Sequence, residues 1–236
     1  VTSEVRVTLP KGLTAISNGG LVSKSDDDAK GTSTFHWRQA IAHSVYLIVV
    51  TAGDYVKIED RWRDVPVEYY VSPDEAEHAR RSFGKTPEML EFFSTILGYP
   101  YPYEKYAQVT VRNYMWGGME HTTATTQNAG TIHDERSELD WTSEGLVSHE
   151  LAHQWFGDLV TCKTWAHLWL NESFATHLAL LWTEHAEGLD EYRMGNYHTR
   201  NGYFGQVNGG GMHPLVHAGY GNCYDMFDGH SYNKGS

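Results

Sequence analysis

The sequence has little cysteine, little basic charge and no long hydrophobic run. Its two cysteines, Cys162 and Cys223, are too few for a disulfide framework, and they leave the redox compartment undetermined. Lys and Arg total 18 against 30 Asp and Glu, which gives a formal net charge of −12 and argues against nucleic acid or an anionic membrane as partner. The longest apolar run, near residues 45–52, is far too short to span a bilayer.

The remaining composition is that of a folded protein with an excess of histidine. Apolar residues make up 40% of the 236 residues and aromatic residues 13%, which is typical of globular domains rather than disordered segments. Histidine occurs 14 times. Histidine is therefore the residue type in which this composition departs most from that of an ordinary globular domain.

The first part of the chain has the pattern of β structure. Alternation of polar and apolar residues at 4–9 predicts a half-buried strand, and the apolar runs at 46–50 and 66–71 predict two more. Turn residues at 18–20 and a polar stretch at 26–31 are typical of hairpin ends. We therefore expect a β-sheet region at the start of the chain.

The pattern becomes mixed after this region. Ser72, followed by proline and acidic residues, predicts the capped start of a helix that continues to residue 97, with a break or kink near Gly84 and Pro87. We further expect a strand at 108–111, helices around 144–156 and 170–185, and no regular element from Gly188 onward.

The segment His149-Glu150-Leu151-Ala152-His153 carries the strongest chemical signal. Positions i and i+4 of a helix lie on one face, so His149 and His153 can direct two imidazoles at one metal ion. Glu150 is placed to reach a metal-bound water rather than the metal itself. This pattern predicts a zinc site with Glu150 as its general base.

A catalytic zinc site needs a third protein ligand, and Glu172 is the candidate. It opens a strongly apolar helix, where a carboxylate is costly unless it is paired or bound to a metal. Two antiparallel helices would bring Glu172 over the histidine pair. The remaining histidines, such as His167, His177, His185 and His230, are interpreted as surface or packing residues.

The run HELAHQWFGDLVTCKTWAHLWLNESFAT resembles the zinc aminopeptidases of the aminopeptidase N and leukotriene hydrolase family, which are gluzincins. Gly117-Gly118-Met119-Glu120 is similar to that family's exopeptidase motif, and the segment from Tyr232 to Gly235 is similar to its Tyr-x-Lys-Gly signature. The motifs occur in the family's order and spacing. The start of the chain also resembles the end of the family's N-terminal β domain.

The resemblance implies an α+β fold, with a thermolysin-like catalytic domain preceded by part of a β-sheet domain. Residues 1–57 would be the C-terminal part of that β domain, and residues 58–236 a catalytic domain incomplete at its C-terminal end. We therefore expect the chain to be part of a longer protein. Its function would be zinc-dependent hydrolysis of the N-terminal peptide bond of peptides that have a free N-terminus.

The resemblance also implies the roles of the site residues. One zinc ion per chain would be held by His149, His153 and Glu172, and Tyr232 would stabilise the tetrahedral oxyanion beside Glu150 as catalytic base. The substrate-binding residues would be Gly117, Gly118, Met119 and Glu120, with Glu120 binding the α-ammonium group.

Two positions depart from the family pattern. His121 stands where the family usually has Asn, which puts the fine positioning of Glu120 in doubt, and Ser173 stands where Gly is common, which we expect to be tolerated. Alternative functions are a zinc endopeptidase, if Glu120 does not face the substrate, and a ligand-holding fragment that is not competent alone. Epoxide hydrolysis, which one branch of the family adds, has no positive sign here. A peptide-binding scaffold with a dead site is disfavoured by the intact motif residues.

Overall fold

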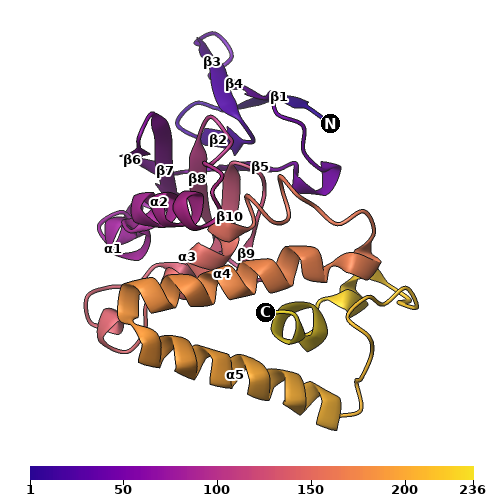
Figure 1. The fold of residues 1–236 in the computed structure, drawn as a ribbon. Coiled ribbons are helices and arrows are strands. Elements are labelled where there is room, and N and C mark those ends of the chain that lie inside the picture. The colour runs from indigo at the N-terminus through magenta and orange to yellow at the C-terminus, as the bar shows by residue number, and fades with distance from the viewer. The chain divides into compact units, whose positions relative to one another are not determined.

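The structure is a computed structural model that describes all residues 1–236. It divides them into two compact units, Val1–Glu144 and Gly145–Ser236. The first unit is mainly β-sheet and the second is mainly helical (Figure 1). The α+β class expected from the sequence is confirmed. The proposed domain boundary after residue 57 stays a prediction.

The first unit begins with short antiparallel sheets. Strands β1 (Ser3–Pro10), β4 (Thr32–Gln39) and β3 (Gly20–Asp27) form a three-stranded sheet in that order, and β2 (Thr14–Ser17) pairs with β5 (Val50–Gly53). Alternate residues of β4 are buried, as the period of a half-buried strand requires. The alternating first strand and the polar hairpin tip expected from the sequence are both confirmed.

A five-stranded mixed sheet forms the rest of the β structure. It contains β6 (Val56–Trp62), β7 (Val65–Val71), β8 (Tyr106–Val111), β10 (Ala124–Asn128) and β9 (Gly118–Met119), in that order across the sheet. The three central strands are parallel, and the two edge strands run antiparallel to their neighbours. The short strand β9 is therefore an edge strand.

The helical part of the first unit differs from its sequence prediction. Ser72 precedes a short 3-10 turn and makes no side-chain cap. The first α-helix, α1, starts later and covers Ala79–Phe83. Helix α2 (Thr86–Ile96) then begins with Pro87 in its first turn, where a missing N–H costs no hydrogen bond. The predicted break is thus the boundary between two helices.

The predicted buried strand at residues 46–50 is wrong. Residues Val45–Leu47 form a 3-10 turn, and pairing starts only at Val50, the first residue of β5. Within the turn only Leu47 is buried. An apolar run without alternation does not distinguish a strand from a turn that buries one side chain.

The second unit is built on three helices, α3 (Glu144–Ala152), α4 (Trp169–Glu187) and α5 (Leu189–Asn208). Helices α4 and α5 pack side by side as a hairpin (Figure 1), joined at Gly188, whose φ of 102° suits glycine. Helix α5 lies where the sequence predicted no regular element, which corrects that prediction. A π-helical turn, His230–Lys234, follows near the end of the chain. No helix in the chain combines the length and hydropathy that a membrane span requires.

Candidate active site

Helices α3 and α4 bring three potential metal ligands together in the second unit. Helix α3 buries Val147, Leu151 and Ala152, and this buried face fixes the rotation of the helix. Although α3 ends at Ala152, the amide of His153 still donates to the carbonyl of His149 at 3.2 Å. The i, i+4 relationship between the two histidines is therefore kept, and both lie on one face.

The three ligand atoms form a compact triangle. The Nε2 atoms of His149 and His153 are 3.1 Å apart, and Oε2 of Glu172 lies 3.4 Å from the first and 3.2 Å from the second. Tetrahedral zinc with bonds of about 2.0–2.2 Å places its ligand atoms about 3.3–3.6 Å apart. The observed triangle is close to one face of such a tetrahedron, so the donor set fits zinc and leaves a fourth position for water or substrate.

The protonation of His153 suits this role. Its Nδ1 atom lies 2.9 Å from the carbonyl oxygen of Phe156, which can only accept a hydrogen bond. Nδ1 therefore carries the proton, and Nε2 directs its lone pair at the centre of the triangle. A backbone carbonyl that fixes the tautomer of a ligating histidine is a common feature of metal sites.

Burial and charge set the ionisation of the other two ligands. Burial lowers the pKa of His149, which favours the neutral imidazole that metals bind. For Glu172 in the metal-free protein, burial raises the pKa, but the positive charge of protonated His153 and hydrogen bonds from both histidines outweigh burial and lower the pKa. A cation bound to the neutral imidazoles would replace that positive charge and favour the same carboxylate form. Two neutral imidazoles and one carboxylate are the donor set of many catalytic zinc sites.

Glu150 and Tyr232 belong to the same unit as the three potential ligands. Glu150 is buried on α3 between the two histidines, and its carboxylate is not one of the three converging ligand atoms. The ring of Tyr232, in the π-helical turn, lies nearly parallel to the ring of His149, with centroids 6.1 Å apart. The structure thus gathers five sequence-predicted residues, His149, Glu150, His153, Glu172 and Tyr232, in the second unit.

Comparison with known proteins agrees with this geometry. The sequence model described as "Peptidase family M1 domain" matches residues 81–236, well over half of the chain. The chain belongs to peptidase family M1. It is 30% identical over 189 residues to Aminopeptidase M1 of Arabidopsis thaliana, covering 78% of this chain and 21% of that protein.

Other M1 relatives have similar coverage. Endoplasmic reticulum aminopeptidase 1 of Mus musculus is 34% identical over 166 residues, with 68% of this chain and 18% of the relative covered. Aminopeptidase N of Streptomyces lividans is 34% identical over 189 residues, with 75% and 21% covered. The M1 chain described here thus spans about a fifth of the length of these relatives.

The residues of this M1 chain that resemble the exopeptidase motif lie in the first unit. Gly118 and Met119 form β9, where they pair with Gln127 and Thr126 of β10. Gly117 precedes that strand, and its carbonyl accepts from the amide of Asn128 at 2.8 Å. Because β9 is the last strand of the sheet, its other edge is not paired with a further strand.

Glu120 follows this strand directly and is buried. The hydroxyl of Tyr46 lies 3.5 Å from its Oε1 atom, a long hydrogen bond. The next residue, His121, stands in the place of the family's usual Asn, and burial lowers its pKa to about 4. His121 is therefore neutral near pH 7, and its Nδ1 lies 3.0 Å from the hydroxyl of Thr126. A neutral hydrogen-bonding ring thus occupies a position where the family usually has an amide.

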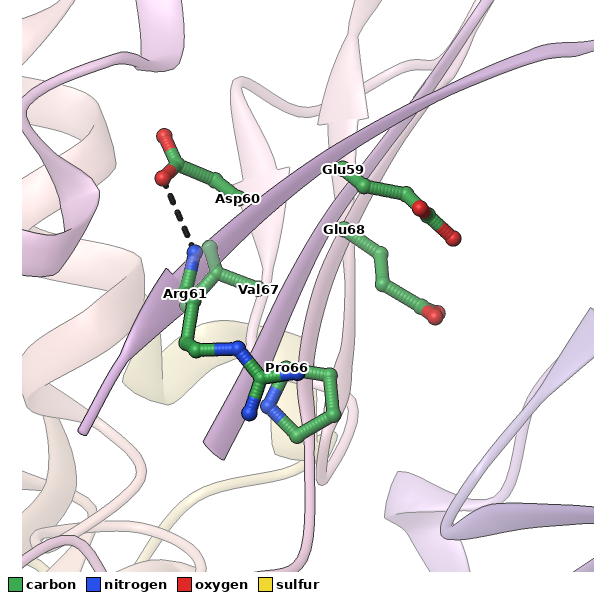
Figure 2. Close-up of a pocket in the computed structure, with 6 residues that line it drawn as sticks. All are labelled: Glu59, Asp60, Arg61, Pro66, Val67 and Glu68. Atoms are coloured by element: carbon green, nitrogen blue, oxygen red, sulfur yellow. Dashed lines mark hydrogen bonds between the residues drawn. The ribbon is translucent and has the colours of Figure 1, made fainter. Parts of the chain in front are cut away.

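A separate depression on the β6–β7 hairpin has a volume of about 450 Å³ and is open (Figure 2). Glu59 and Glu68 line it and extend their carboxylates to the same side (Figure 2). Lys57 pairs with both, since its Nζ lies 2.8 Å from Glu59 and 2.6 Å from Glu68. These contacts account for the acidic residues, and the depression brings together no catalytic set.

Some residues around the site were not identified from sequence. The sequence does not identify Asp228 or His213, and the buried position of His230 agrees with its interpretation as a packing residue. His230 is fully buried and lies 3.0 Å from Asp228, which also pairs with His213 at 2.8 Å. Two sequence features lie near these residues: the His213-Pro214 pair, and Asp228 shortly before the Tyr232 motif. Neither has a spacing that is diagnostic of a functional site.

Proposed function

We propose that this chain carries the catalytic centre of a zinc aminopeptidase, which hydrolyses the N-terminal peptide bond of peptides with a free N-terminus. The observation that carries the proposal is the convergence of His149, His153 and Glu172 within 3.4 Å of one another. When bound there, zinc would polarise the scissile carbonyl and lower the pKa of the attacking water.

The protein's own residues would perform the proton transfers. Glu150 is buried and follows His149 directly on α3, and its carboxylate would accept the proton of the attacking water and pass it to the leaving amine. Tyr232 would donate a hydrogen bond to the carbonyl oxygen as negative charge develops on it. Its nearly parallel arrangement with His149 supports this role, because it keeps the phenol in the immediate surroundings of the ligands.

The first unit would supply substrate binding. The edge strand β9 offers main-chain groups with which an extended peptide can pair, and Gly117 and Gly118 allow close approach because they have no side chain. Glu120 would bind the substrate's α-ammonium group through charge-assisted hydrogen bonds. An internal residue of a peptide has no such ammonium, so this contact would restrict cleavage to the N-terminus.

The test uses zinc-loaded protein containing residues 1–236 and a panel of aminoacyl reporters with free and acetylated amines. An aminopeptidase cleaves the free-amine reporters and leaves the acetylated ones largely intact. Equal cleavage of both would favour the endopeptidase alternative. Zinc binding without cleavage of either would favour a fragment that holds the ligands but is not competent alone.

A further inference from the structure

The turn that carries Tyr232 is attached to α4 at the residue next to Glu172. The hydroxyl of Ser173 donates a hydrogen bond of 2.6 Å to the carbonyl oxygen of Ser231. Ser173 is 1% exposed and Ser231 is fully buried, so water does not compete for this bond. A metal ligand and the proposed oxyanion donor are therefore each one residue away from the same hydrogen bond.

Packing at Gly235 strengthens this attachment. A Cβ atom at residue 235 would lie 2.1 Å from Oγ of Ser173 and 2.7 Å from its Cβ, so only glycine fits. The π-helical turn thus rests directly on Ser173 at Gly235 and is hydrogen-bonded to it at Ser231. Ser173 stands where the family commonly has Gly, which has no hydroxyl to make the bond.

The start of the turn is held by a second set of contacts. Oδ1 of Asp228 accepts from the amides of His230 at 2.9 Å and Ser231 at 3.3 Å. His213, Asp228 and His230 are of residue types that bind metal ions, but the amide of His213 donates to Nε2 of His230 at 3.2 Å. Nε2 thus holds the lone pair, and Nδ1 carries the proton that it donates to Asp228. A protonated Nδ1 does not bind metal, so this cluster supports the turn.

We propose that Ser173 is a positioning residue, which fixes the phenol of Tyr232 relative to the metal ligands through its bond to Ser231. The inference rests on the proposed function. With the start of the turn held by Asp228, the Ser173 bond is a buried hydrogen bond that links the Tyr232 segment to the Glu172 helix. Loss of this bond leaves the turn in place but allows the phenol to shift. Displacement of a catalytic group by about 1 Å can cost 10²-fold in rate.

The test is a double-mutant cycle between Ser173→Ala and Tyr232→Phe, in zinc-loaded protein containing residues 1–236. Ser173→Ala should lower kcat by about 5- to 50-fold, with KM changed less than twofold and one zinc retained. In the Tyr232→Phe background the same substitution should change kcat less than twofold, because no phenol remains to be positioned. Ser148→Ala is the matched control, because Ser148 is also buried beside a metal ligand but donates to Gly145 of its own helix at 3.1 Å.

Hydrogen exchange of the metal-free protein gives a readout independent of activity. Amides of residues 229–236 should exchange several-fold faster in Ser173→Ala, while those of α4 are unchanged. The proposal would be overturned if Ser173→Ala lowered kcat equally in the wild-type and Tyr232→Phe backgrounds, or if it left hydrogen exchange unchanged. Loss of zinc from Ser173→Ala would also overturn it, because Ser173 would then serve the fold alone. If the wild type cleaves no reporter, or Tyr232→Phe keeps full kcat, the proposed function fails instead, whatever exchange shows.

Discussion

The ring of Tyr232 lies alongside the imidazole of His149, with 18° between the ring planes and 6.1 Å between centroids. The two residues come from distant parts of the sequence, one from α3 and the other from the π-helical turn. A π-helical turn is rare and occurs often at functional sites, because it re-aims a side chain within a helical segment. Here the turn places the ring of Tyr232 beside that of His149, one of the proposed metal ligands.

Tyr232→Phe tests the role of the phenol directly. The variant keeps the ring beside His149 and removes only the hydroxyl, so zinc content and melting temperature should match the wild type. Loss of one oxyanion donor costs about 10²–10³-fold in kcat. Steady-state kinetics with a free-amine reporter provide the measurement. A kcat within threefold of the wild type would remove Tyr232 from the mechanism.

His153→Ala tests the metal assignment. The substitution removes one of three ligands and leaves Glu172 with a single imidazole partner, so zinc should dissociate on dialysis. His185→Ala, an exposed histidine on α4, is the matched control and should keep one zinc. Elemental analysis of both variants is sufficient. A full equivalent of zinc in His153→Ala would contradict the ligand set.

Glu150→Gln tests whether Glu150 acts as the general base rather than as a metal ligand. An amide cannot accept a proton, so kcat should fall by about 10²–10⁴-fold while zinc remains bound. The exposed Glu184→Gln on α4 controls for the loss of one negative charge and should retain wild-type kcat. Near-normal turnover of zinc-loaded Glu150→Gln would assign the proton transfer to another group.

The parts of the site that depend on local spacing could be predicted from the sequence. His149 and His153 are one helical turn apart, and Glu172 opens the next helix, so the geometry of α3 and α4 brings them together with few other requirements. The attachment of the Tyr232 turn to Ser173 could not be predicted. It joins residues far apart in the chain, and serine carries no signal of such a role.

Helix α5 shows a different limit of sequence reasoning. It has no buried residue and carries glycines at positions such as Gly195 and Gly202, so it lacks both apolar periodicity and helix propensity. Its neighbours explain the glycines. A Cβ at Gly195 would lie 2.6 Å from Leu180, and one at Gly202 would lie 2.7 Å from Asn233. A larger residue at either position would displace the end of a neighbouring side chain, so these glycines, which by propensity alone argue against a helix, allow α5 to pack close to its neighbours.

Glu120→Ala distinguishes an exopeptidase from an endopeptidase. Truncating one partner of a buried charge pair costs about 2–5 kcal/mol, so kcat/KM on free-amine reporters should fall by roughly one to three orders of magnitude. Zinc content should not change. Acetylated reporters should be poor substrates for the wild type and no worse for the variant. An unchanged ratio of free to acetylated cleavage would end the aminopeptidase proposal.

The first unit contains a buried lysine whose ionisation affects stability. Nζ of Lys105 donates to the carbonyl oxygens of Ser17 and Gly19 at 2.8 and 2.7 Å and lies 4.2 Å from the ring centroid of Trp37. Burial lowers the pKa of Lys105 to about 7, opposed in part by the charges of Glu68 and Glu104. A neutral amine has two N–H groups, which match the two carbonyls.

This pKa predicts a stability that rises with pH. Between pH 7 and about 10.4, the ordinary value for lysine, the unfolded chain binds more protons at residue 105 than the folded chain. The free energy of unfolding should therefore increase from pH 7 to pH 9, by at most about 1.4 kcal/mol per pH unit from this group, and decrease as pH falls toward 7. Urea unfolding at both pH values, compared between wild type and Lys105→Met, measures this contribution. Lys85→Met, which removes a half-exposed lysine, should keep the wild-type pH dependence; the same dependence in Lys105→Met would show that its source lies elsewhere.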